Sequence, residues 1–114
     1  MKVSHLEGDV LDRFVARAEG LKLIVLHNEY FDGWYVETPP IEPQAVSCYS
    51  TRWDDGGPII GQSRMTIEFD SLPGGDTYTA IQPDSQYFMS GKTHLIAAMR
   101  CYIASKFGEE VADE

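Results

Sequence analysis

The stretch Tyr49-Ser50-Thr51-Arg52-Trp53-Asp54-Asp55-Gly56-Gly57-Pro58-Ile59-Ile60 separates two halves of the chain and is unlike the sequence on either side. Two adjacent glycines followed by a proline are unsuited to a regular helix or strand, so we expect a loop here. The stretch also places an arginine, a tryptophan and two carboxylates beside this flexible backbone. A loop of this composition on a rigid scaffold is a candidate recognition surface.

On the N-terminal side of this stretch, the sequence predicts one amphipathic helix. Apolar residues recur at helical spacing over residues 6–18, and charged residues fall largely on the opposite face. Ser4 and Glu7 have the spacing of a capping box. Gly20 is expected to end the helix in the left-handed conformation that glycine adopts easily.

A hairpin is predicted between this helix and the central stretch. Residues 21–26 and 34–38 are rich in β-branched and aromatic residues, and residues 27–33 are expected to turn the chain, with Asp32-Gly33 as the strongest local signal. Two prolines then end the second strand, because proline cannot donate a ladder hydrogen bond. Residues 39–47 are expected to form an irregular crossing.

On the C-terminal side, the sequence predicts a second hairpin. Residues 64–69 alternate between apolar and polar side chains, as a half-buried strand does. Residues 72–76 have the composition of a turn, and residues 77–81 are expected to form the fourth strand. Residues 82–91 are expected to be a polar loop.

The last predicted element is a helix capped by Thr93, with an apolar face that runs from Leu95 to Phe107 and a stop at Gly108. The acidic tail, residues 109–114, is expected to fray. The order is helix, hairpin, long loop, hairpin, helix. It predicts one α+β domain over residues 1–114, with an antiparallel sheet of about four strands and a helix from each end packed on it.

Composition narrows the classes of partner. The chain has 114 residues, with 18 acidic and 9 basic residues and a net charge of −9. This charge opposes direct binding to duplex nucleic acid, whose affinity depends on neutralising phosphates. It is compatible with a small local cationic pocket, with docking on a basic protein, or simply with solubility.

The sequence also indicates the cellular compartment and whether a metal site is expected. No apolar run is long enough for a membrane span, and the first residues do not resemble a signal peptide, so we expect a cytosolic protein. Cys48 and Cys101 are far apart in sequence and are expected to be free thiols. Together with His5, His27 and His94 they show no metal-binding spacing, so no metal and no cofactor is expected.

The central stretch has the ingredients of a pocket for a nucleotide-like ligand. Gly56 and Gly57 could expose backbone N–H groups to an anion, and Arg52 and Arg64 could supply charge. Trp53 or Tyr49 could offer a flat face for a ring. The alternative is structural: the glycines and proline let the chain bend, and Trp53 plugs the core beneath.

Three further residues are candidates outside this stretch. Lys92 and His94 flank the start of the last helix, where anions can bind, and Arg100 lies within that helix. Ordinary capping is the alternative for this helix start. The sequence contains no nucleophile elbow, no phosphate-binding Gly-Lys-Ser/Thr loop and no metal-ligating histidine pair, so we expect no catalytic residues and no enzyme activity.

Three segments of the chain resemble the NinX-type proteins of lambdoid and related phages, a domain of unknown function. They are residues 11–20 (LDRFVARAEG), residues 49–53 (YSTRW) with 56–60 (GGPII), and residues 95–108 (LIAAMRCYIASKFG). Phe14 stands where a tryptophan is usual, and residues 61–63 replace a more charged segment. The resemblance implies a small phage accessory protein, made in the cytoplasm of the infected bacterium and absent from the virion. It implies no particular activity.

Our leading hypothesis is a non-catalytic, counter-defensive binding protein that sequesters a small anionic nucleotide-derived signal, as a homo-oligomer. The alternative is an acidic inhibitor that binds a basic host protein. The expected ligand-binding residues are Tyr49, Arg52, Trp53, Gly56, Gly57, Arg64, Lys92, His94 and Arg100.

Overall fold

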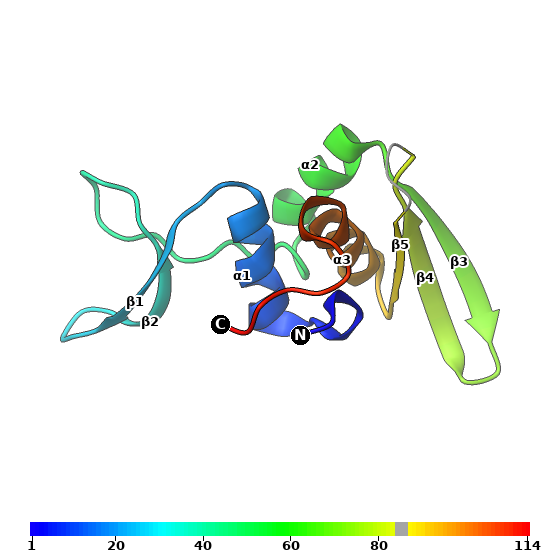
Figure 1. The fold of residues 1–114 in the computed structure, drawn as a ribbon, viewed down its shortest axis with the longest axis horizontal. Coiled ribbons are helices and arrows are strands. Elements are labelled where there is room, and N and C mark those ends of the chain that lie inside the picture. The colour runs from blue at the N-terminus through cyan, green and yellow to red at the C-terminus, as the bar shows by residue number, and fades with distance from the viewer. Residues whose placement is uncertain (84–86) are drawn as a thin grey trace.

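Helix α3 (His94–Phe107) lies at the centre of the molecule, between α1 and a β-sheet (Figure 1). The computed structural model describes residues 1–83 and 87–114. Eight residues of α3 are buried, so the helix is covered on several sides. Thr93 caps it as predicted, since its Oγ1 accepts a hydrogen bond from the N–H of Ile96 at 3.1 Å. Gly108, with φ +90°, ends it.

Helix α1 (Gly8–Ala18) packs against α3 and follows a short 3₁₀ turn, η1 (Val3–His5). The predicted capping box is wrong, because Ser4 belongs to η1 and Glu7 precedes α1 without a side-chain cap. The predicted stop is confirmed: Gly20 has φ +83°, and the two N–H groups after the C-cap return to carbonyls of the last turn. The buried residues of α1 include Leu11, Phe14 and Val15 of the predicted apolar stripe, and also Ala16 and the carboxylate residue Asp12, which lay outside it.

Strands β1 (Leu23–His27) and β2 (Asp32–Val36) form the first hairpin, as predicted. The turn, residues 28–31, lies within the predicted residues 27–33, but Asp32-Gly33 does not make it, because this pair lies inside β2. The Asn28 side chain makes the turn by accepting hydrogen bonds from the N–H groups of Tyr30 and Phe31, both at 2.9 Å. Asparagine was thus the turn-forming residue of this hairpin.

The second sheet has the strand order β3-β4-β5, all antiparallel: β3 (Thr66–Leu72), β4 (Gly75–Ile81) and β5 (Phe88–Gly91). The β3–β4 hairpin is confirmed, although β3 is more exposed than its alternating pattern suggests. The predicted loop over residues 82–91 is wrong for residues 88–91, which form β5. Residues 84–86 of that predicted loop lie outside the described residues.

The α+β class is confirmed, and the strands form two sheets instead of one. The sheets lie at opposite ends of a molecule that measures 48 × 29 × 27 Å, with α1 and α3 between them (Figure 1). The core is built chiefly from these two helices. Within residues 1–83 and 87–114, no helix is long and apolar enough to cross a membrane.

The central stretch is not a loop: Trp53–Ser63 forms a helix, α2, with Pro58 inside it. The proline lacks the N–H that would reach Asp54, but Asp54 is exposed and water can pair with its carbonyl. Gly56 is buried against Tyr49, where an added Cβ would collide with the Tyr49 carbonyl oxygen. The glycine therefore permits close packing of a helix.

The tail, which was expected to fray, is paired with other parts of the chain. Glu110 forms a β-bridge with Lys2, and the N–H of Val111 donates to the carbonyl of Met1 at 2.9 Å. Glu114 reaches across to Arg13 and Arg17 of α1, which brings both ends of the chain to one side of α1.

Both cysteines are free, as predicted. Cys101 is buried in α3, and burial raises the pKa of its thiol. Cys48 is exposed in the segment between β2 and α2.

Candidate functional site

The nine residues proposed from the sequence fall into three separate places. The start of α2 carries Tyr49, Arg52, Trp53, Gly56 and Gly57. Lys92 and Arg100 line a pocket at the free edge of β5, and Arg64 ends α2 at a third place. His94 joins the first group in space, as described below.

Tyr49 and Gly56 act in packing. Tyr49 is buried, and burial raises the pKa of its phenol. The N–H of Gly56 donates to the carbonyl of Arg52 at 2.9 Å, as expected for a first helical turn. Because the N–H of Gly56 is used inside the helix, it is not free to cradle an anion. The nearest atom to a Cβ on Gly57 would be a Trp53 ring carbon at 3.6 Å.

Arg52 and Trp53 open α2 at the surface. Trp53 is 55% exposed. The guanidinium of Arg52 lies 3.5 Å from the carboxylate of Asp54, with both side chains largely in water. Such an exposed ion pair is weak, so Arg52 remains able to approach another anion.

Four rings from four elements form a continuous row on the surface. The ring centroids lie 5.8 Å apart for Trp53 and His94, 4.0 Å for His94 and Tyr78, and 5.3 Å for Tyr78 and Phe69. We call Trp53, His94, Tyr78 and Phe69 the aromatic row. Both ends are open, since Phe69 is 54% exposed and Trp53 is similarly exposed. A flat ligand could stack on either end.

A hollow of about 290 Å³ adjoins the Trp53 end of the aromatic row. One wall comes from Ser50, Thr51 and Trp53, and the other from residues 93–96 at the start of α3. The hollow therefore combines an indole face with the hydroxyl groups of the two segments.

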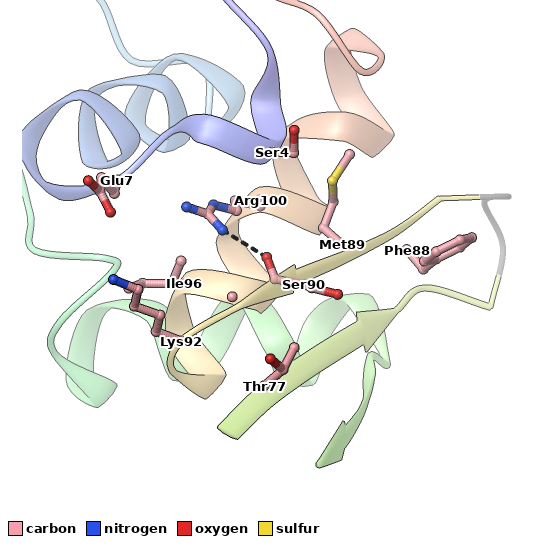
Figure 2. Close-up of a pocket in the computed structure, with 10 residues that line it drawn as sticks. Ser4, Glu7, Thr77, Phe88, Met89, Ser90, Lys92, Ile96 and Arg100 are labelled. Carbon is pink, nitrogen blue, oxygen red and sulfur yellow. Dashed lines mark hydrogen bonds between the residues drawn. The ribbon is translucent and has the colours of Figure 1, made fainter. Parts of the chain in front are cut away.

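A second pocket, of about 420 Å³, lies at the free edge of β5 (Figure 2). Its ten lining residues are Ser4, Glu7, Thr77, Phe88, Met89, Ser90, Gly91, Lys92, Ile96 and Arg100. Figure 2 shows the Arg100 side chain reaching from α3 toward β5, with Lys92 and Glu7 on the same side of the pocket. Ile96 lines both this pocket and the hollow by Trp53, so the two flank the start of α3.

Arg100 is held by the backbone on both sides of its pocket. Its Nε donates to the carbonyl of Leu6 and its Nη1 to the carbonyl of Ser90, both at 2.8 Å. Within the described part of the chain, no carboxylate lies within 4.0 Å of this guanidinium. Burial lowers the pKa of Arg100, with Glu7 acting in the opposite direction. Arg100 thus ties the uncovered edge of β5 to the segment before α1.

Arg64 lies apart from both groups. It ends α2 in the left-handed conformation, with φ +54°. It lines a polar hollow of about 450 Å³ together with Gln62, Ser63, Gln82, Tyr102 and Lys106. The sequence suggested that Arg52 and Arg64 hold one ligand together. That would need both arginines at the same end of α2, whereas they lie at opposite ends.

The sequence did not single out Tyr78 and Phe69 as site residues. The register of the β3–β4 hairpin places them directly opposite each other. Counting residues outward from the β3–β4 turn along both strands would have paired Phe69 with Tyr78, because cross-strand neighbours follow from the position of the turn. Among the described residues, no group of three His, Cys, Asp or Glu side chains is arranged to hold a metal.

Comparison with known proteins gives one family. The family model described as bacteriophage P22, NinX matches residues 2–106. This range includes every residue of the aromatic row and of both pockets at the start of α3. No curated protein matches the chain.

Proposed function

The chain belongs to the bacteriophage P22 NinX family, and we propose that it acts as a non-catalytic binding protein for a small anionic nucleotide-like ligand. As a member of this family it is a phage accessory protein. Its place of action in our proposal is the cytoplasm of the infected bacterium. The binding site we assign is the aromatic row with the hollow beside Trp53.

The aromatic row carries the proposal. Exposed aromatic side chains are costly to leave in water, and here the exposed rings of Trp53, His94 and Phe69 form one row with the half-buried Tyr78, across four elements. Base–aromatic stacking contributes about 1–3 kcal/mol per base, and it accepts any flat ring. A base stacked on Trp53 would lie next to His94 and at the mouth of the hollow.

Local charge supports an anionic ligand in a chain whose net charge is −9. Arg52 stands next to Trp53 at one side, and Lys92 is exposed two residues before His94 at the other. The first turn of α3 also presents backbone N–H groups. A phosphate attached to the stacked ring would therefore meet positive charge from both α2 and the start of α3.

Ligand recovery tests the proposal most directly. The purified protein would be heated, and the released small molecules identified by mass spectrometry. Cyclic nucleotides and NAD derivatives would then be titrated onto the emptied protein. We expect one of them to bind, and we expect binding to be lost in Trp53→Ala and reduced in Arg52→Ala and Lys92→Ala.

Tyr30→Ala is the matched control, because Tyr30 is an exposed aromatic residue, 82% exposed, in the turn of the other hairpin. The Tyr30→Ala variant should bind the ligand with the same affinity as the unchanged protein. Either the absence of any ligand in the whole panel, or a bound ligand whose affinity Arg52→Ala does not change, contradicts the proposal. A ligand recovered in chemically altered form would instead indicate an enzyme.

Sequestration gives the binding site a role during infection. A phage protein that removes a nucleotide-derived immune signal would blunt host defence without any chemistry. This role requires the protein in excess of the signal, and a homo-oligomer would raise the number of sites per particle. Light scattering of the purified protein with and without ligand measures its oligomeric state.

The β3–β4 hairpin favours a second candidate, an acidic inhibitor of a basic host protein. Leu72 and Phe69 are each 54% exposed on β3, next to Glu68 and Asp70. Apolar side chains surrounded by carboxylates suit a partner with a basic rim. This candidate predicts a host protein recovered by affinity capture, binding that weakens steeply with salt, and loss of capture in Leu72→Ser.

A further inference from the structure

Two arginines of α1 hold the side chain of Glu114, the C-terminal residue, which lies beside α1 on the side of the β1–β2 hairpin (Figure 1). Arg13 donates from Nε and Nη2 to the two carboxylate oxygens, at 2.7 and 2.6 Å. Arg17 donates from Nη2 to one of them at 2.9 Å. Only 13% of the Glu114 side chain is exposed. This is the two-pronged geometry by which arginine recognises a planar carboxylate.

The two arginines are positioned by aromatic rings of the folded chain. Their guanidinium carbons lie 5.2 Å (Arg13) and 5.4 Å (Arg17) from the centroid of the Trp34 ring. Arg17 also lies over Phe14, at 4.8 Å. These contacts come from α1 and β2 and do not involve the tail, so the site is organised independently of Glu114. We call Arg13, Arg17 and Trp34 the arginine clamp.

The tail fills the arginine clamp incompletely. Nη1 of Arg17 is buried, and it has no acceptor in the described part of the chain. The neighbouring Asp113 is 85% exposed and touches only the N-terminal amine, at 3.4 Å. Residues 109–111 are paired with residues 1–3, so residues 112–114 can move alone to vacate the arginine clamp, and a ligand that also satisfied Arg17 would bind more completely.

We propose that the arginine clamp is a binding site for a carboxylate of an acidic peptide on a partner protein, and that Glu114 is its resident competitor. The aromatic floor suits a ligand with an apolar stem below its charge, as glutamate has. Asp9, Asp12 and Asp32 line the adjoining hollow of about 390 Å³, together with Arg13 and Trp34. These carboxylates oppose a phosphate dianion more strongly than a single carboxylate.

This site is separate from the aromatic row, so it can be tested whether or not the proposed nucleotide-like ligand binds. The test uses the full chain carrying Trp53→Phe, in which Trp34 is the one remaining tryptophan. Glu114→Gln is added to vacate the arginine clamp, and the acetylated peptide of residues 109–114 (EEVADE) is titrated while Trp34 fluorescence is followed. Asp113→Asn is the matched control, because it removes a neighbouring charge that does not touch the arginine clamp.

The Glu114→Gln chain should bind the peptide saturably. The Glu114-containing chain and the Asp113→Asn chain should bind it at least about tenfold more weakly, because the attached tail competes at a high effective concentration. Adding Arg13→Gln to the Glu114→Gln chain should abolish binding. The peptide EEVADQ should not bind.

Four results would overturn the proposal. One is equal binding of the peptide by the chains with and without Glu114. Another is binding that persists in the Arg13→Gln chain or with the peptide EEVADQ. The third is an equal fluorescence change with inorganic phosphate at matched ionic strength, which would show that the clamp does not select a peptide carboxylate. Absence of any saturable binding to the Glu114→Gln chain also rejects it.

Discussion

Gly56 is the position at which α2 comes closest to the segment before it. A Cβ there would collide with the Tyr49 carbonyl oxygen and lie 2.8 Å from Cδ2 of Leu95. Neither neighbour can move freely, since Tyr49 and Leu95 are both buried. We expect Gly56→Ala to lower the free energy of unfolding by about 2 kcal/mol or more, measured by urea denaturation.

Gly57→Ala is the matched comparison, one residue further along the same helix. Its Cβ would find ordinary contact distance, 3.6 Å, to the ring of Trp53. Alanine has the higher helix propensity, so we expect this variant to be about 0.5–1 kcal/mol more stable than the parent. Equal effects of the two substitutions would show that the close approach to Tyr49 does not constrain α2.

Arg100 and Lys92 share one pocket but have different contacts. Arg100 donates hydrogen bonds to two backbone carbonyls, those of Leu6 and Ser90, whereas Lys92 is exposed. Arg100→Met should therefore destabilise the fold by about 2 kcal/mol, because it removes both hydrogen bonds, including the part-buried one to the carbonyl of Leu6. Lys92→Met should leave stability within about 0.5 kcal/mol. Thermal unfolding measures the stability of both variants. Equal stabilities would show that the hydrogen bonds by which Arg100 joins β5 to Leu6 do not stabilise the fold.

At the scale of secondary-structure elements, the helices with caps and continuous apolar faces could be predicted. Helix α3 has both Thr93 and Gly108 as its limits, and both act as predicted. Helix α2 could not be predicted from local rules, because Gly56, Gly57 and Pro58 each disfavour a helix. What stabilises α2 is contact with Tyr49 and α3, which local propensity does not contain.

Strand β5 was missed for a related reason. Phe88–Gly91 is short, and its exposed and buried residues alternate over only four positions. Such a pattern does not distinguish a strand from a loop until its partner β4 is known. The same dependence on pairing applies to the aromatic row: Trp53 and His94 were identified by type, whereas Tyr78 and Phe69 required the register.

The tail segment should have a pH dependence of its own. The hydrogen bonds from Arg13, helped by Arg17, hold the pKa of Glu114 below its usual value of 4.5. A lowered pKa in the folded state stabilises the fold above the usual value, and this contribution is lost as pH falls through the lowered one. The stability difference between the parent chain and Glu114→Gln, at most about 1 kcal/mol, should be constant near neutrality and vanish in acid.

Urea denaturation of both chains at several pH values measures this difference. Asp113→Asn is again the control, and its difference from the parent should stay small throughout. A parent advantage that persists well below the lowered pKa of Glu114 would mean that its charge is not the source of the tail contact.

At the scale of the whole molecule, two hairpins extend in opposite directions from the helices (Figure 1). Leu11, Met99 and Ile103 are fully buried between these helices, whereas β1 and β3 are half-buried or exposed along their length. Backbone amides of α3 should exchange with deuterium at least about a thousandfold more slowly than those of the hairpin ends. Mass spectrometry of exchanged peptides tests this, and equal rates in β1 and α3 would indicate one cooperative unit.

The central position of α3 has a consequence for synthesis of the protein on the ribosome. All other helices and strands precede α3 in sequence, yet most of the core belongs to it or packs on it. A nascent chain that has not yet released residues 94–107 has no partner for the apolar faces of α1 and of the second sheet. The domain must therefore acquire its tertiary structure late, after almost all of its residues have emerged.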